Sequence, residues 1–165
     1  MLLIERRHDG TIPATERLVL PFDLRQKSRL RTKLESGEEV ALFLERGIVL
    51  RGGDRLQAQD SRVVEIVAAE ERLLVVTASN SRELARAAYH LGNRHIPVEV
   101  GPESLKLEYD HVLEIMLRGL GVQVAEASGP FEPEAGAYGG GHRRDHDEDE
   151  ATQIAELLTI KRAHS

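Results

Sequence analysis

Histidine is the residue type with which this sequence could do chemistry. The 165 residues contain seven histidines and 28 aspartates and glutamates, but no cysteine. Without cysteine there can be no disulfide, thiolate metal site or thiol nucleophile. A metal site would therefore be built from imidazole, carboxylate and water. A single histidine is more often a surface residue than a ligand, so each one is weighed by its neighbours.

His95 follows Gly92, Asn93 and Arg94, between a predicted helix and a predicted strand. Gly92 and Asn93 both tolerate a positive φ, so we predict a sharp turn there that presents the imidazole on a rigid base. The alternative is a loop histidine that simply faces water.

Three further histidines have carboxylates beside them. His111 follows Asp110 at a predicted helix start, where a residue without any role is the competing reading. His142 and His146 are four residues apart and lie beside Asp145 and Asp147. On a helix they would share one face, and in a glycine-led tail they would be mobile ligands. A solvated charge run is the common alternative.

Coordination number makes a one-histidine site insufficient. Ni²⁺ and Cu²⁺ take about four to six ligands, so His95 alone cannot hold either ion specifically. A two-fold dimer that placed His95 beside its symmetry mate would supply two imidazoles. His142 or His146 could then close over the ion, in an open-sided site suited to handing it on. Cu²⁺ should bind at least as well as Ni²⁺, and Zn²⁺ should compete.

The elements around these residues predict an α+β protein of two small domains and a tail. Residues 1–72 contain short apolar runs separated by turn signals, which predict a β-sandwich or barrel with strands at 18–20, 39–44, 48–50 and 61–68. Residues 73–129 read as strand 73–78, a helix capped by Asn80 and ended by Gly92, strands 96–100 and 105–107, a helix capped by Asp110, and strand 122–125. That βαββαβ order predicts a ferredoxin-like domain. A flexible linker is predicted to begin at Ser128, and residues 130–165 are predicted to form a flexible, acidic, histidine-containing tail.

Several function classes are excluded by composition and motifs. The net charge is -6, with the acidic excess mainly in the tail, which argues against nucleic-acid binding. No GxxxxGK[ST], GxGxxG, GxSxG or HExxH motif occurs. The N-terminus does not read as a signal peptide, and no run reaches the roughly 18 apolar residues of a membrane span. We therefore expect a cytoplasmic protein that is not an enzyme.

A basic run occupies residues 25–33. On a strand, its five charged side chains would project to one side, namely Arg25, Lys27, Arg29, Arg31 and Lys33. One interpretation is a docking surface for an acidic partner. The other, at even weight, is an edge strand protected by charge against aggregation.

Two longer motifs carry a resemblance to a known family. The run Tyr89-His90-Leu91-Gly92-Asn93-Arg94-His95 is followed by Ile96-Pro97, and Tyr109-Asp110-His111-Val112-Leu113 is followed by Met116. Over almost its full length the chain resembles UreE, the urease accessory nickel chaperone.

The resemblance implies a first domain that contacts urease or its accessory complex, and a second domain that binds metal and dimerises. His95 would match the interface histidine that binds Ni²⁺ jointly with its mate, and His111 a secondary metal-site histidine. His142 and His146 look like a reduced form of a polyhistidine tail, so little nickel storage is expected. The implied partners are a second copy, apo-urease and its accessory proteins, including the maturation GTPase. A non-catalytic adaptor with incidental metal binding is the alternative function.

Overall fold

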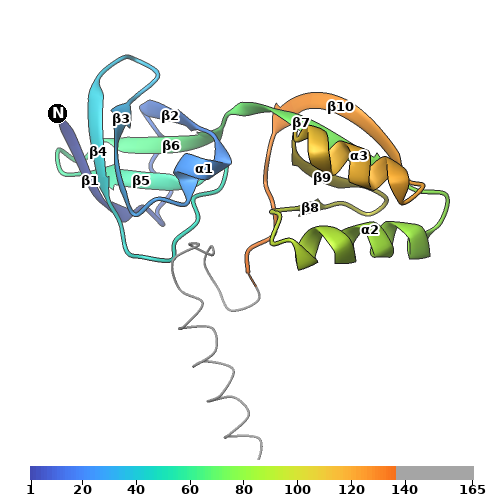
Figure 1. The fold of residues 1–165 in the computed structure, drawn as a ribbon. Helices are drawn as coiled ribbons and strands as arrows, with labels where there is room; N and C mark the ends of the chain where they lie inside the picture. Colours follow the sequence, from blue (N-terminus) through green and yellow to red (C-terminus); the bar gives the residue numbers. More distant parts are fainter. Residues whose placement is uncertain (137–165) are drawn as a thin grey trace, which may run out of the picture.

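The computed structural model describes residues 1–136, which form two domains side by side, each built on its own sheet (Figure 1). The first sheet contains β1 (Leu2–Arg7), β2 (Glu16–Leu20), β3 (Arg29–Lys33), β4 (Glu39–Phe43), β5 (Arg55–Ala58) and β6 (Val63–Ala68), with the short helix α1 (Phe22–Arg25). The second contains β7 (Glu70–Thr77), β8 (Glu99–Val100), β9 (Leu105–Glu108) and β10 (Gln123–Pro130), with helices α2 (Ser81–Asn93) and α3 (His111–Gly119).

The first domain is a sheet that nearly closes on itself, as predicted for a barrel. Its strand order is β2-β6-β5-β1-β4-β3, and the Glu35 N–H donates to the Arg17 carbonyl at 2.9 Å, which links the two edges. Alternate residues point inward, so Leu2 and Ile4 of β1 are buried together with Leu18 and Leu20 of β2. The core is entirely aliphatic, as the aromatic-poor composition requires.

The second domain confirms the predicted ferredoxin-like fold. Its sheet has the order β10-β7-β9-β8, and every pairing is antiparallel. Both helices pack on this sheet through buried residues such as Leu91 of α2 and Leu117 of α3. The predicted caps are also present: the Asn80 side chain accepts from the Glu83 N–H at 2.9 Å, and the Asp110 side chain accepts from the Leu113 N–H at 3.0 Å.

Two predicted strands are wrong or shortened. Residues 48–50 form no strand. Their apolar side chains pack against the hydrophobic cores, and Leu50 is buried. The Leu50 N–H donates to the Arg25 carbonyl at 2.9 Å and not to β4. The strand predicted over 96–100 is only Glu99–Val100, because residues 94–96 close the end of α2.

The basic run does not form one strand. β3 begins at Arg29, so only Arg29, Arg31 and Lys33 share its exposed face. Arg25 lies in α1 and is fully buried, which corrects the prediction that it projects outward. The alternating charges of residues 25–33 are compatible with one strand, and they give no sign that Arg25 lies in a helix before it.

The linker was predicted to begin at Ser128, which is too early in the chain. Ser128, Gly129 and Pro130 are the last residues of β10 and pair with Arg72, Glu71 and Glu70. Phe131 and Pro133 then follow as buried residues. Among the residues described, no helix has the length and apolar character needed to cross a bilayer.

Candidate metal centre

His95 lies in the capping turn two residues after α2, which ends at Asn93. Its φ is 57°, in the left-handed region. The His95 N–H donates to the Gly92 carbonyl at 2.9 Å, and the Ile96 N–H donates back to the Leu91 carbonyl at 3.1 Å. This pair of bonds is the Schellman arrangement, in which the left-handed position is most often glycine.

The predicted turn is therefore present, but the residue that adopts the positive φ is different. Gly92 and Asn93 lie inside α2, and neither has a positive φ. The helix runs past Gly92 because Leu91 is buried in the core and its carbonyl receives the capping bond. Histidine tolerates the left-handed region better than most residues do, although less well than glycine. The backbone strain at the end of α2 thus falls on His95 itself.

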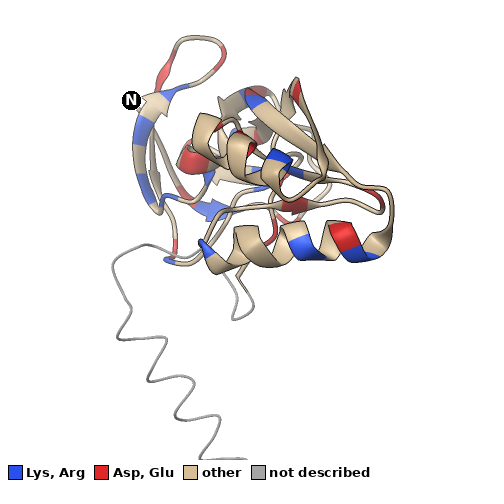
Figure 2. Ribbon diagram, turned by 45° about the vertical axis from the view of Figure 1, so that its right-hand side comes forward, with Lys and Arg blue, Asp and Glu red and all other residues tan. Residues whose placement is uncertain are grey.

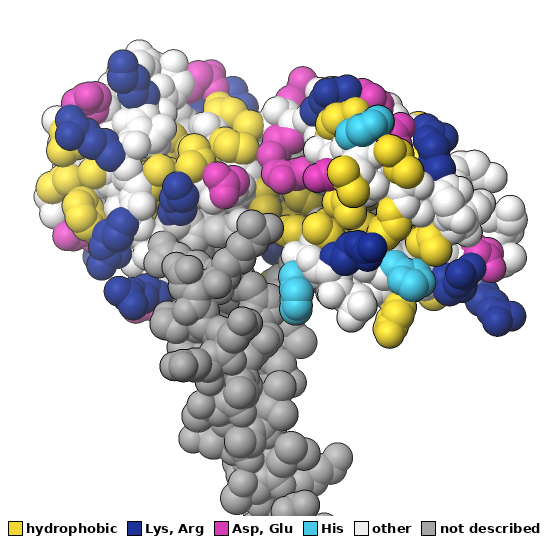
Figure 3. Space-filling model, viewed as in Figure 1, with side chains coloured by type: hydrophobic (Ala, Val, Ile, Leu, Met, Phe, Trp, Pro, Cys, Tyr) yellow, Lys and Arg dark blue, Asp and Glu magenta, His cyan; other side chains and the backbone are white. Residues whose placement is uncertain are grey.

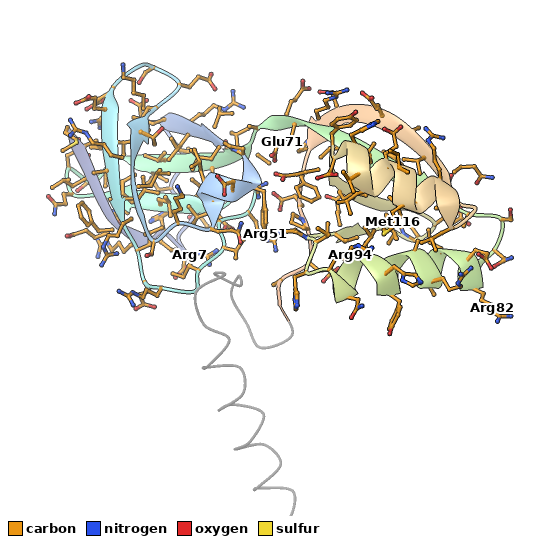
Figure 4. All side chains as sticks on the ribbon, viewed as in Figure 1. Arg7, Arg51, Glu71, Arg82, Arg94 and Met116 are labelled. Carbon is orange, nitrogen blue, oxygen red and sulfur yellow. The ribbon has the colours of Figure 1, made fainter. Side chains whose placement is uncertain are left out.

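The His95 side chain is exposed and makes no hydrogen bond or ion pair with residues 1–136. Its backbone, by contrast, is held on both sides by the capping bonds. Figure 4 labels the neighbouring Arg94 at the end of α2 that faces the first domain. The chain therefore presents an exposed imidazole from a fixed backbone.

His111 is the first residue of α3 and is also exposed. The preceding Asp110 uses its side chain to cap the helix at Leu113. Because α2 and α3 run in opposite directions across one sheet, the end of α2 and the start of α3 lie at the same end of the domain (Figure 1).

Within residues 1–136, no three His, Asp or Glu side chains come together as a possible metal site. His142 and His146 lie outside the described residues. The described part of one chain thus presents His95 and His111 separately and does not complete a coordination sphere.

The helices also expose apolar side chains beside these histidines. Val112 and Ile115 of α3 are 73% and 60% exposed, and Tyr89 of α2 is 68% exposed. Figure 3 shows hydrophobic side chains gathered over the helical side of the second domain, with histidines at the border. Large apolar side chains exposed on the helices of one domain are candidates for contact with another protein. We call Tyr89, Val112 and Ile115 the apolar face. It was not predicted from the sequence, although the outward-facing positions of these residues on their helices could have indicated it.

Together, these features define a two-domain protein that presents histidines beside an apolar face on a ferredoxin-like domain. The family model for the UreE urease accessory protein N-terminal domain matches residues 3–69, and that for the C-terminal domain matches residues 71–156. The chain belongs to the UreE family of urease accessory proteins.

Similar proteins named urease accessory protein UreE occur in several bacteria. That of Cupriavidus necator is 56% identical over 148 residues, which cover 90% of this chain and 77% of the relative. That of Ralstonia nicotianae is 54% identical over 148 residues, covering 90% and 70% respectively. That of Burkholderia pseudomallei is 60% identical over 130 residues, covering 79% and 63%.

Proposed function

We propose that this protein is a cytoplasmic metallochaperone that binds Ni²⁺ and delivers it to apo-urease during assembly of the active site, without catalysis of its own. The family assigns it to urease maturation, whose accessory proteins, including the maturation GTPase, are its expected partners. The observation that carries the metal role is His95, an exposed imidazole at a position of backbone strain. Strain retained at an exposed polar residue is typical of functional sites.

The metal site is proposed to lie between two copies of the chain. One exposed imidazole cannot hold Ni²⁺, and residues 1–136 offer no third ligand nearby. The apolar face lies on the same helical side and supplies a surface for a two-fold contact. His95 and its mate would be the central ligands, His142 or His146 would complete the site, and His111 is a secondary candidate. Cu²⁺ and Zn²⁺ should compete in vitro.

The dimer is tested by placing a charge on the apolar face. We expect Ile115→Glu to yield a folded monomer, because the carboxylate would have to be buried in the contact. Tight Ni²⁺ binding should weaken by about 10²-fold, because the two imidazoles no longer act together. Light scattering and Ni²⁺ calorimetry would measure these effects, with about one tight ion per dimer expected for the unmodified protein.

Ile12→Glu is the matched control. Ile12 is 54% exposed, close to the 60% of Ile115, but lies in the first domain. It should leave both the oligomeric state and Ni²⁺ binding unchanged. If Ile115→Glu remained a dimer with normal Ni²⁺ affinity, the apolar face would not be the interface.

The adaptor alternative rests on the exposed face of β3. There Arg29 donates to the Leu44 and Ser28 carbonyls, and Arg31 lies 3.4 Å from Glu39, so two of the three basic side chains have local partners. Basic and acidic residues both occur in both domains (Figure 2).

The charge reversal Arg31→Glu decides between the two functions. In cells that carry Arg31→Glu as their only copy, we expect urease maturation to change less than twofold, because exposed surface charges contribute little. Arg82→Glu on α2 is the control and should behave in the same way. If Arg31→Glu abolished maturation while His95→Ala supported it, the adaptor function would replace the metallochaperone.

A further inference from the structure

The two domains are joined along the chain by a single residue. β6 ends at Ala68 and β7 begins at Glu70, so only Ala69 lies between the two sheets. Domains joined by so short a link are expected to turn against each other unless a further contact holds them. The residues that follow β10 supply such a contact.

Residues 131–134, which we call the strap, lie between the domains. Phe131 is 0% exposed and packs edge-on against Phe22 of α1, with ring centroids 5.7 Å apart. Leu73 of β7 completes this cluster. The cluster therefore joins α1 of the first domain to the strap and to a strand of the second, and turning one domain against the other would expose it to water.

The Glu132 carboxylate is received by donors of the first domain. Its Oε1 accepts from Arg25 and, at 3.3 Å, from the Gly52 N–H, and its Oε2 lies 3.7 Å from Nη1 of Arg51. Arg25 also donates to the Phe131 carbonyl. Figure 4 labels Arg51 at this side of the junction. A carboxylate that contacts two guanidinium groups and a backbone N–H is held more firmly than one in an isolated surface ion pair.

Arg25 is fixed within the first domain. Its side chain is 0% exposed. Its Nε donates to the Leu20 carbonyl at 3.2 Å, and its Nη1 donates to the Leu50 carbonyl at 3.1 Å. Burial lowers the pKa of Arg25, and the negative charge of Glu132 opposes that shift. Because a buried guanidinium is retained only where its donors are satisfied, the first domain presents a positive charge that needs the carboxylate of the strap.

The backbone of the strap is bound by the second domain. The Glu132 N–H donates to Glu99 Oε1 at 2.9 Å, and the Glu134 N–H donates to the Val98 carbonyl, also at 2.9 Å. The other carboxylate oxygen of Glu99 lies 3.3 Å from Nζ of Lys106 on β9, so this acceptor is itself held. The strap thus offers backbone N–H groups to one domain and side chains to the other.

The opposite side of the junction is held less firmly. Glu71, which Figure 4 labels there, accepts from the Phe22 N–H at 3.1 Å. Partial burial and the negative charges of Glu71 and Asp23 raise the pKa of Glu108, so carboxylates of both domains act on one another here. Because like charges repel, the relative position of the domains depends on the strap more than on this side.

We propose that the strap is an interdomain latch, in which the Phe131 ring and the Glu132 carboxylate hold the two domains in one relative position and whose release lets them turn about Ala69. The latch releases from the first domain and stays attached to the second, where its backbone N–H groups are bonded. This inference goes beyond the proposed function, because it requires neither a metal ion nor a partner protein.

The test measures the distance between the domains in the full-length protein. Because the chain has no cysteine, Lys33→Cys on β3 and Glu103→Cys between β8 and β9, both at exposed positions, can carry a pair of spin labels. The labelled chain is diluted with unlabelled chain, so that electron paramagnetic resonance reports distances within one copy. Glu132→Gln removes the charge that Arg25 holds but retains the shape of the side chain, and it should broaden the distance distribution about twofold or more. Phe131→Leu weakens the latch without a change of charge and should broaden the distribution as well, also if Glu132→Gln folds poorly.

Glu126→Gln is the matched control. Glu126 also pairs its carboxylate with an arginine, lying 3.0 Å from Nη2 of Arg72, but this pair is exposed and lies within the second domain. The control variant should leave the distance distribution unchanged.

Hydrogen exchange distinguishes release of the latch from local unfolding. In Glu132→Gln, the Phe22 N–H should exchange about tenfold faster, because its bond to Glu71 crosses the junction and opens when the domains turn. The Glu134 N–H should keep its protection, because its bond to the Val98 carbonyl lies on the side that stays attached.

Two sets of results would overturn the latch. One is an unchanged distance distribution in both Glu132→Gln and Phe131→Leu, or equal broadening in Glu126→Gln. The other is loss of protection at the Glu134 N–H together with the Phe22 N–H, which would show that the strap unfolds as a whole.

Discussion

Replacing His95 by alanine is expected to abolish tight Ni²⁺ binding. The variant removes the imidazole from both copies of the proposed site at once, and the tail histidines alone would bind at least about 10²-fold more weakly. Calorimetry at neutral pH measures the loss. Urease maturation at limiting Ni²⁺ should fall in parallel, in cells that carry the variant as their only copy. Native affinity in His95→Ala would refute the assignment.

Glycine at the same position separates the chemical role of His95 from its structural role. The left-handed backbone at φ 57° costs a non-glycine residue roughly 1–2 kcal/mol, partly offset by the greater freedom of glycine in the unfolded chain. We therefore expect His95→Gly to raise the free energy of unfolding by about 1 kcal/mol relative to His95→Ala. Both variants should lose Ni²⁺ binding equally.

Urea denaturation of the two variants checks this comparison. If His95 were only a helix cap, glycine would stabilise the protein and Ni²⁺ binding would be unchanged in both variants. If His95→Gly proved no more stable than His95→Ala, the left-handed conformation would not be a source of strain. Affinity for Ni²⁺ in the native protein should also weaken as the pH falls into the range where imidazoles gain a proton, because a protonated ring cannot bind a metal.

Replacing Arg25 by methionine is expected to cause the largest loss of stability. The side chain is 0% exposed, and its removal leaves the Leu20, Leu50 and Phe131 carbonyls and the Glu132 carboxylate without this donor. A buried acceptor left without its donor costs about 1–3 kcal/mol, and three carbonyls lose a donor here, so we expect a loss of at least about 3 kcal/mol. Chemical denaturation should show this loss. It should also separate the unfolding of the two domains, because Arg25 joins the first domain to Phe131 and Glu132, which follow β10 of the second domain.

Arg29→Met is the matched control for Arg25→Met. Arg29 donates to two backbone carbonyls, where Arg25 donates to three, and each guanidinium lies 5.5 Å from a phenylalanine ring. It differs in being exposed, so water can replace it and its loss should cost less than about 1 kcal/mol. Equal losses in the two variants would show that burial is not what gives Arg25 its importance.

The second domain was the part most accessible to prediction, because its signals are local. Asn80 and Asp110 each precede an amphipathic helix and bond to a backbone N–H three residues later. Such short-range contacts follow from sequence spacing alone. The first domain was harder to predict. Residues 48–50 have the composition of a strand, but their apolar side chains pack against the hydrophobic cores without forming one. Only long-range packing distinguishes these two causes.

The sequence alone determined the two-domain α+β class, the ferredoxin-like order and His95 as the leading histidine, since cap residues, apolar periodicity and a run of motif residues are all local. The tertiary structure decided that His95 carries the left-handed strain, that Val112 and Ile115 form an exposed face, and that Arg25 is buried against Glu132. Those features join residues far apart in the chain, 107 positions for Arg25 and Glu132. A charged residue is predicted to be exposed unless a partner from elsewhere in the fold is known. For that reason the sequence predicted Arg25 on the surface, whereas the fold buries it against Phe131 and Glu132.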